Sequence, residues 1–152
     1  MLERASHGKP ALSGLLADCV PWPKAARTAP LNPVRASLED WTHGPGLPAI
    51  RLAWTLYPRT AQDAADWLAL AARAGHMLWL ADLRAAERNL DLPAVLLAGM
   101  LTGRRGRRFL ASGGLEGCAA RAGLRVVWRQ PFWAGAGLVL GLTRPTSGNR
   151  QI

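Results

Sequence analysis

The chain has 152 residues, of which 49% are hydrophobic, and a formal net charge of +9 at pH 7. This length suits one domain with its own core, and the apolar fraction excludes a disordered chain. The longest apolar stretches, Pro93 to Leu101 and Pro131 to Leu142, are far shorter than the roughly 20 residues that a membrane-spanning helix requires. We therefore expect a cytoplasmic protein with no secretory signal and no membrane partner.

The positive charge is carried almost wholly by arginine, since Lys9 and Lys24 are the only lysines. The densest cluster is GRRGRR, from Gly103 to Arg108, between two predicted helices. A solvated loop and a phosphate-binding patch are both compatible with it. The three histidines are scattered, and Cys19 and Cys118 stand far apart, so the sequence predicts no metal site.

The first half of the chain predicts two short strands separated by a long loop. Ala11 to Ala17 forms an apolar run typical of a buried strand. Residues 19–35 hold four prolines and are expected to be loop, after which Arg35 to Trp41 can form one or two helical turns. Ala49 to Leu56, bounded by two prolines, is typical of a second strand.

A strand, a helix and another strand follow one another in the middle of the chain. Thr60 can cap a helix, Asp63 completes the capping pattern, and Gly75 stands where a C-terminal glycine is common. Met77 to Ala81 then forms a strand that leads into Asp82. Such a unit predicts parallel pairing of the two strands.

The second half predicts two helices followed by an antiparallel pair of strands. The expected elements are a helix opened by Pro93 and closed by Gly103, a helix over Gly114 to Ala122 capped by Gly123, strands over Leu124 to Arg129 and Leu138 to Thr143, and a disordered tail over 144–152.

The segments HMLWLADLRAAERNLDLP and FLASGGLEGCAARAGLRVVWRQPFWAGAGLVLGL together resemble the C-terminal half of class I S-adenosylmethionine-dependent methyltransferases. MLERA, LLADCVPWP and IRLAWTLYP resemble the helix after strand two, strand three and strand four of that family. The resemblance implies an α/β fold, a partial Rossmann-like sheet that is mostly parallel with a C-terminal antiparallel pair and helices on both faces. Residues 1–152 would form a single methyltransferase-like domain that is N-terminally incomplete.

The family's glycine-rich cofactor loop has no counterpart in the chain. Such a loop must follow a strand and open a helix, whereas GPG at 44–46 and GAG at 135–137 both precede strands. We therefore expect this chain alone to bind S-adenosylmethionine weakly or not at all.

The resemblance also implies site residues. Asp18 would bind the adenine amino group, and the other cofactor-binding residues would be Cys19, Trp22, Trp54, Thr55 and Leu56. Tyr57, Asp82, Arg84 and Arg88 would lie on the substrate side, because ligands bind beyond the carboxyl ends of parallel strands. Asp82 is a candidate base, with a capping or ion-paired aspartate as the alternative. Trp22, Trp41, Trp54, Trp79 and Trp133 could line an apolar pocket or belong to the core.

Three functions remain open. The first is methyl transfer from S-adenosylmethionine to a small molecule. The second is a catalytically inactive methyltransferase-like module for binding or dimerisation, and the third is an arginine-rich nucleic-acid-binding protein. Without strands one and two, strand four would lack a neighbour, which a homodimer or a missing N-terminal segment could supply. We expect instead that Leu12 to Leu16 moves beside Leu52 to Leu56, giving the strand order 3-4-5-7-6.

Overall fold

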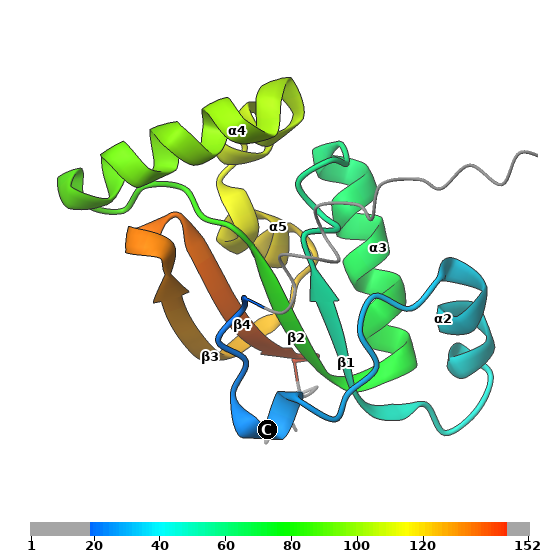
Figure 1. The fold of residues 1–152 in the computed structure, drawn as a ribbon. Coiled ribbons are helices and arrows are strands. Elements are labelled where there is room, and N and C mark those ends of the chain that lie inside the picture. The colour runs from blue at the N-terminus through cyan, green and yellow to red at the C-terminus, as the bar shows by residue number, and fades with distance from the viewer. Residues whose placement is uncertain (1–18, 146–152) are drawn as a thin grey trace, which may run out of the picture.

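The computed structural model describes residues 19–145. The strand expected at Ala11 to Ala17, Asp18 and most of the expected tail lie outside the described residues. The helices are α2 (Arg35–Thr42), α3 (Ala61–Ala74), α4 (Leu92–Ala111) and α5 (Gly114–Arg121), with short 3₁₀ helices η1 (Lys24–Ala26), η2 (Asn89–Asp91) and η3 (Trp133–Gly135). The strands are β1 (Leu47–Ala53), β2 (Gly75–Leu83), β3 (Arg125–Phe132) and β4 (Gly137–Thr143), as Figure 1 shows.

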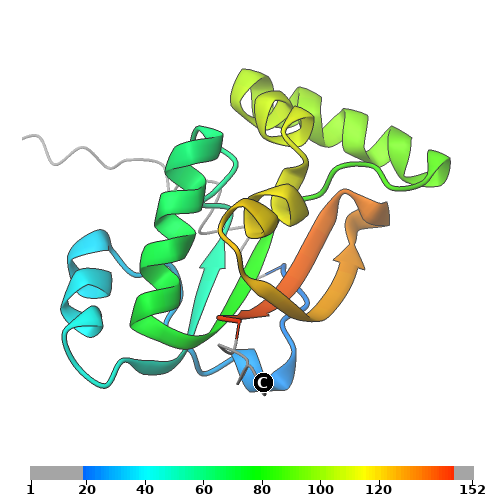
Figure 2. The ribbon, with the colours of Figure 1, turned by 180° about the vertical axis from the view of Figure 1, so that it is seen from behind.

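The four strands form one sheet in the order β1-β2-β4-β3. β1 and β2 are parallel, and β4 is antiparallel to both β2 and β3. This arrangement confirms the α/β class, the antiparallel C-terminal pair and the order expected for strands four, five, seven and six. α3 and α5 cover one face, η1 lies over the other, and α4 crosses the end of the sheet where β1 and β2 finish (Figures 1 and 2).

The helix between the parallel strands begins as its sequence predicts. The Thr60 hydroxyl accepts a hydrogen bond from the Asp63 amide at 3.2 Å, which satisfies one of the unpaired donors of the first turn. Gly75 differs from the expectation, because its φ of −128° is extended and not left-handed. Its role is steric: a Cβ there would stand 2.9 Å from the Ile50 Cδ1 atom, so glycine lets β2 begin directly after the helix.

The free edge of β1 is covered by residues 30–32. The Arg51 amide donates to the Pro30 carbonyl, and the Asn32 amide donates to the Arg51 carbonyl, both at 2.8 Å. One step further, the Asn32 side chain takes the place of a backbone: its Oδ1 accepts from the Ala53 amide at 2.7 Å and its Nδ2 donates to the Ala53 carbonyl at 3.1 Å.

These bonds bear on the neighbour expected for β1. The segment Leu12 to Leu16 lies outside the described residues, but within Leu52 to Leu56 the backbone groups of Ala53 that such a pairing requires are bonded to the Asn32 side chain. The expected pairing is therefore wrong at Ala53, and the backbone groups of Arg51, just before that range, are bonded to Pro30 and Asn32. Because a proline and an asparagine side chain occupy the edge, few unpaired donors remain there for another strand.

The element α4 consists of two helical segments that meet at Gly103. Gly103 has φ 71° and ψ −156°, so it ends the first segment as expected, but a second segment that was not expected runs on directly to Ala111. The arginine cluster therefore lies on a helix and not in a loop, although its four arginines are exposed as expected. Even α4, the longest helix within residues 19–145, does not combine the length and the hydrophobicity needed to cross a membrane.

Candidate functional site

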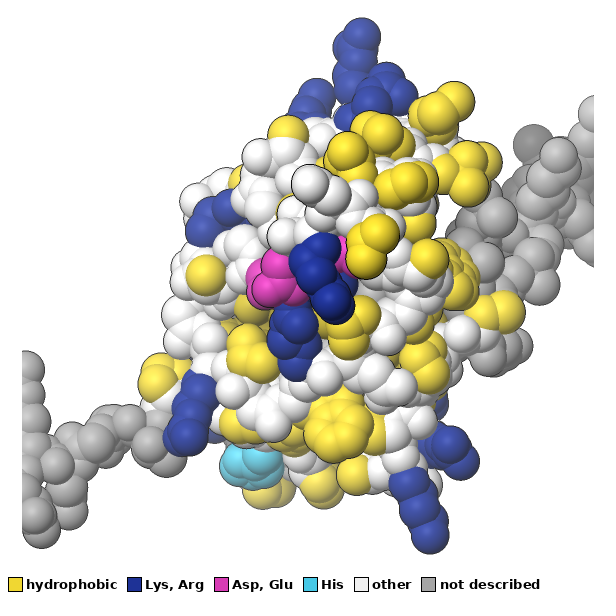
Figure 3. Space-filling view, turned by 90° about the vertical axis from the view of Figure 1, so that its left-hand side faces the viewer, with side chains coloured by type: hydrophobic (Ala, Val, Ile, Leu, Met, Phe, Trp, Pro, Cys, Tyr) yellow, Lys and Arg dark blue, Asp and Glu magenta, His cyan; other side chains and the backbone are white. Residues whose placement is uncertain are grey.

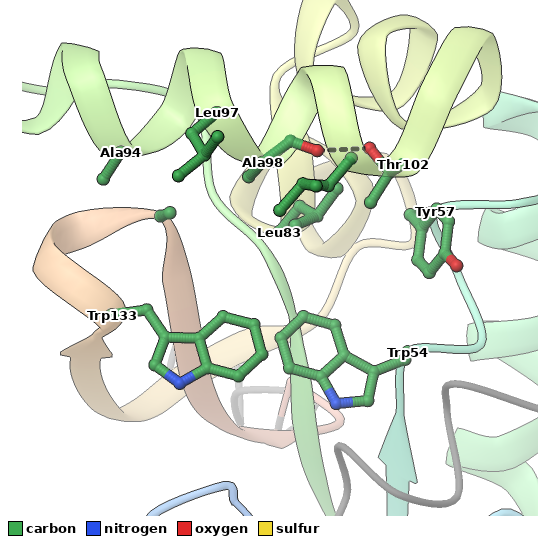
Figure 4. Close-up of a pocket in the computed structure, with 10 residues that line it drawn as sticks. Trp54, Tyr57, Leu83, Ala94, Leu97, Ala98, Thr102 and Trp133 are labelled. Carbon is green, nitrogen blue, oxygen red and sulfur yellow. Dashed lines mark hydrogen bonds between the residues drawn. The ribbon is translucent and has the colours of Figure 1, made fainter.

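A pocket of about 470 Å³ lies where the parallel strands end. Trp54 and Tyr57, which follow β1, and Leu83, the last residue of β2, line one side. Ala136 and Trp133 come from the connection between β3 and β4, and α4 closes the opposite side (Figure 4). The remaining lining residues, all on α4, are Ala94, Leu97, Ala98, Leu101 and Thr102. The position matches the usual ligand side of an open α/β sheet.

Two tryptophan rings form the wall facing α4. The Trp54 and Trp133 rings are stacked with centroids 4.9 Å apart and planes 13° apart, and Phe132 packs edge-on against both. The rings lie side by side in Figure 4, below the helix. Aromatic groups arranged in this way bury a large apolar area with little freedom.

The backbone around these rings is in a costly conformation. Trp54, Trp133 and Ala134 have φ values of 58°, 50° and 51°, in the left-handed region that residues with a Cβ rarely adopt. Trp54 is held there because its amide donates to the Ala81 carbonyl at 2.9 Å, extending the parallel ladder by one residue. Strained backbone of this kind gathers at ligand sites, since it must be maintained by its surroundings.

Polar groups are few in the pocket. The Thr102 hydroxyl donates to the Ala98 carbonyl at 2.6 Å within α4. Among the residues that line the pocket, Tyr57 alone has a titratable side chain. Burial and, secondarily, the negative charge of Asp82 raise the pKa of Tyr57, while Arg105 opposes them. Tyr57 is thus a neutral phenol at pH 7, able to donate or accept one hydrogen bond.

Asp82 lies behind the pocket wall and not in the pocket. Its Oδ2 accepts from the Leu56 amide at 3.0 Å and its Oδ1 from the Leu83 amide at 2.8 Å, so the carboxyl joins the ends of β1 and β2. Burial raises the pKa of Asp82 to about 7, against the opposing hydrogen bonds from the amides of Leu83, Leu56 and Tyr57. This geometry is that of a carboxyl that positions the loop after β1.

Arg84 is also buried, with 2% of its surface exposed. Its guanidinium forms an ion pair with Glu87 and lies 3.7 Å from carboxylate oxygens of both Asp91 and Glu116. The Arg129 guanidinium on β3 bonds the same Glu87 and Glu116 at 2.8 and 2.9 Å. The cluster joins the segment before α4 to α5 and β3, so Arg84 is committed to holding the fold together.

The structure thus divides the predicted site residues. Trp54, Tyr57 and Trp133 line the pocket. Thr55 and Leu56, which lie between Trp54 and Tyr57 in the sequence, do not line it. Arg88 is exposed and its amide donates to Asp91 at 3.1 Å, while Asp82 and Arg84 serve the scaffold. Cys19 is exposed, Trp22 is buried with the Arg51 guanidinium 5.5 Å from its ring, and Asp18 lies outside the described residues.

The α4 side of the pocket was not among the site residues expected from the sequence. Ala94, Leu97, Ala98 and Leu101 recur at a spacing of three and four residues, which places them on one side of a helix. The helix expected from Pro93 to Gly103 contains this pattern and Thr102, but nothing in its sequence distinguishes a pocket wall from an ordinary core face.

Buried polar atoms mark the end of β1 as a place where a polar ligand could bind. Thr55 Oγ1 and the indole nitrogen of Trp54 are buried and have no hydrogen-bond partner among the described residues. Neither connection that leads from a strand to a helix within residues 19–145 contains a glycine. The described residues thus supply unpartnered polar atoms at the end of β1 but no close backbone approach for a cofactor. They also contain no group of histidine, cysteine and acidic side chains that could hold a metal ion.

Comparison with known proteins gives similarity to solved structures alone, since no family model and no curated protein matches the chain. An O-methyltransferase from neocarzinostatin biosynthesis, solved with S-adenosyl-L-homocysteine and 1,4-dihydroxy-2-naphthoic acid, is 18% identical with a TM-score of 0.46 over 66% of this chain and 30% of its own. Magnesium protoporphyrin IX methyltransferase from Synechocystis PCC 6803, solved with bound S-adenosyl-L-homocysteine, is 14% identical with a TM-score of 0.44. The match covers 69% of this chain and 48% of that methyltransferase.

The mitomycin 7-O-methyltransferase is 19% identical with a TM-score of 0.46, covering 69% of this chain and 32% of its own. This chain therefore spans between about a third and a half of the length of the methyltransferases that it resembles.

Proposed function

We propose that the protein takes part in methyl transfer from S-adenosylmethionine to a small, largely apolar molecule held in the pocket. The observation that carries the proposal is the position of this pocket, at the carboxyl ends of β1 and β2, in a sheet with the strand order that the methyltransferase resemblance predicts. The cofactor would lie against Trp54, Thr55 and Leu56, where buried polar atoms lack partners.

The chemistry suits an apolar pocket with few polar groups. S-adenosylmethionine supplies an electrophilic methyl group on a positively charged sulfur. Transfer of that group is an in-line displacement, for which alignment of the two reactants contributes much of the rate. Trp54, Leu83 and Leu97 can exclude water and hold the acceptor, and the neutral Tyr57 hydroxyl can orient its polar atom by one hydrogen bond.

Cofactor affinity is expected to be low for this chain alone. Since no strand-to-helix connection within residues 19–145 offers a glycine-rich loop, we expect titration calorimetry with S-adenosylhomocysteine to give a dissociation constant weaker than about 100 μM. A micromolar or tighter constant would contradict this expectation and would show that another segment replaces the loop.

The test uses 2-naphthol, a planar aromatic alcohol, as a probe acceptor. We expect it to quench tryptophan fluorescence through Trp54 and Trp133, and Trp133→Ala to weaken its binding roughly tenfold or more. Trp128→Ala is the matched control, because Trp128 is 44% exposed, as Trp133 is 41% exposed, but does not line the pocket. Equal effects of the two variants would refute the pocket as the binding site.

Methylated 2-naphthol, detected by mass spectrometry after incubation with S-adenosylmethionine, separates the proposal from its nearest alternative. A catalytically inactive binding module would hold the probe in the same pocket and give no methylated product at any cofactor concentration. That alternative is favoured by one observation: neither Asp82 nor Arg84 lines the pocket, so no charged group of the described residues faces the acceptor.

A further inference from the structure

The exposed surface of η2 and of the first half of α4 is unusually apolar. Six large hydrophobic side chains from η2 and the first half of α4 are exposed to between 45% and 85%: Leu90, Leu92, Leu96, Leu97, Met100 and Leu101. Figure 3 shows hydrophobic side chains gathered over the upper part of this side of the molecule. A single exposed leucine needs no explanation, but a contiguous group of this kind marks an interaction surface.

The second half of α4 is strongly basic. Beyond the kink at Gly103, Arg104, Arg105, Arg107 and Arg108 are all exposed. None of them forms an ion pair within residues 19–145, and α4 contains no aspartate or glutamate. The helix therefore presents an apolar half followed by a basic half, with lysine and arginine side chains at the top of Figure 3 beside the hydrophobic ones.

We propose that α4 binds the surface of an anionic lipid bilayer. An interfacial helix inserts apolar side chains among the acyl chains near the headgroups, while arginines bind the phosphates. Leucines and methionine before Gly103 and arginines after it supply both interactions. No apolar segment of the sequence is long enough to span a membrane, which led us to expect no membrane partner, but a helix that lies in the interface need not span the bilayer.

A second copy of the chain fits this surface less well. Two copies of α4 packed against each other would bring eight arginines into or around one interface without a carboxylate on either helix to pair with them. Unpaired charges that lose water destabilise an interface strongly. Anionic headgroups neutralise the same arginines while the apolar half is buried.

The pocket opens beside this surface, because Leu97 and Leu101 line the pocket and are also 55% and 77% exposed. A bound bilayer would therefore lie at the pocket mouth. This consequence rests on the proposed function: the acceptor would be a lipophilic molecule that partitions into the bilayer. Binding of α4 to lipid does not itself depend on methyl transfer.

Co-sedimentation with vesicles tests the contact. We expect the protein to bind vesicles of phosphatidylcholine mixed with phosphatidylglycerol and not vesicles of phosphatidylcholine alone. Replacing Arg104, Arg105, Arg107 and Arg108 with Gln should weaken binding on the order of a hundredfold. The control replaces four other exposed arginines with Gln, namely Arg35, Arg73, Arg125 and Arg144, and carries the same net charge. It should bind as the parent does within about threefold.

A second variant tests insertion. Leu96→Gln with Met100→Gln changes two exposed side chains that do not line the pocket beside the strands, and it should also abolish sedimentation with anionic vesicles. Equal loss in the control variant, or no binding by the parent chain, would overturn the proposal. A third result would also overturn the proposal: both the four-arginine variant and Leu96→Gln with Met100→Gln still bind vesicles, and the latter variant converts a dimer into a monomer. The apolar surface would then be a contact between two copies of the chain. Quenching by 2-naphthol without vesicles is measured in parallel, so failure of the pocket is distinguished from failure of the surface.

Discussion

The two sides of the pocket are built in opposite ways. On the strand side, Trp54 and Leu83 are only 4% and 2% exposed and belong to the core of the sheet. On the α4 side, Leu97 and Leu101 are more than half exposed although they line the same cavity. The strand side of the pocket is therefore part of the hydrophobic core, whereas the α4 side consists of a largely exposed helix that crosses the end of the sheet.

The difference follows from how each side is held. The strand side is tied by the β1–β2 ladder and by the Asp82 carboxyl, which bonds the amides of Leu56 and Leu83. α4 is anchored near its ends, by the Arg84–Asp91 pair before it and by Phe109, which is 2% exposed, in its last turns. Substitutions on the strand side should therefore alter stability and binding together, whereas substitutions of the exposed α4 leucines that line the pocket should alter mainly binding.

A matched pair of leucines gives the largest expected contrast. Leu83→Ala removes a buried side chain and should lower the free energy of unfolding by about 3 kcal/mol, while Leu97→Ala should lower it by less than about 1 kcal/mol. Both enlarge the pocket, so both should weaken 2-naphthol binding. Urea denaturation gives the first quantity and fluorescence titration the second. Similar stability losses for the two variants would show that α4 is as much part of the core as the strands are.

The Asp82 carboxyl should make the strand side sensitive to pH. Its pKa is about 7 in the folded protein and near 3.8 when unfolded, so the folded state binds more protons between those values. The stability contributed by the protonated form is complete below the unfolded pKa and is lost as pH rises through the folded one. We expect a loss of about 2 kcal/mol between about pH 5 and pH 7.

Asp82→Asn keeps an acceptor oxygen and cannot ionise, so the difference in stability between parent and variant isolates this group. Urea denaturation at several pH values should give a smaller slope for the variant across that range. Parallel slopes for the two proteins would mean that the carboxyl is ionised in the folded state and that its amide hydrogen bonds outweigh burial.

The sequence predicted the strand side well because local patterns determine it. The Thr60 cap, the apolar strands and the order of elements all follow from residue type and spacing, and parallel strands separated by a helix must end on the same side of a sheet. The sequence therefore predicted that Trp54 and Tyr57 lie at the end of the sheet where the pocket is found.

The rest depended on interactions between distant residues. Nothing near Asp82 or Arg84 indicates that each would be enclosed, since their partners include Leu56, 26 residues before Asp82, and Glu116 on α5. Asn32 acts as a substitute strand through bonds to Ala53, 21 residues away. Gly103 ends one helical segment as its sequence predicts, but that a second segment follows directly and places Phe109 in the core is not visible in the local sequence.

Gly103 itself allows a sharper test of how α4 is held. Its φ of 71° disfavours any residue with a Cβ, although a Cβ there would meet open space. Gly103→Ala should therefore cost about 1 to 2 kcal/mol, through backbone conformation alone. Gly99→Ala is the control in the same helix: Gly99 is helical and its Cβ would make ordinary contacts, so alanine should be neutral or slightly stabilising. A neutral Gly103→Ala would indicate that α4 straightens at little cost.

The smallest effect is expected from the arginines at the end of α4. Arg104, Arg105, Arg107 and Arg108 are exposed, lie close together on one helix and form no ion pair within residues 19–145. Replacing all four with Gln removes mutual repulsion and no folded contact that the described residues show, so the unfolding free energy should change by less than about 1 kcal/mol. Differential scanning calorimetry at low and high salt checks this, since repulsion between exposed charges weakens with salt. A loss of several kcal/mol would instead show that these arginines hold the fold, which would make α4 an integral part of the domain and remove the contrast between the two sides of the pocket.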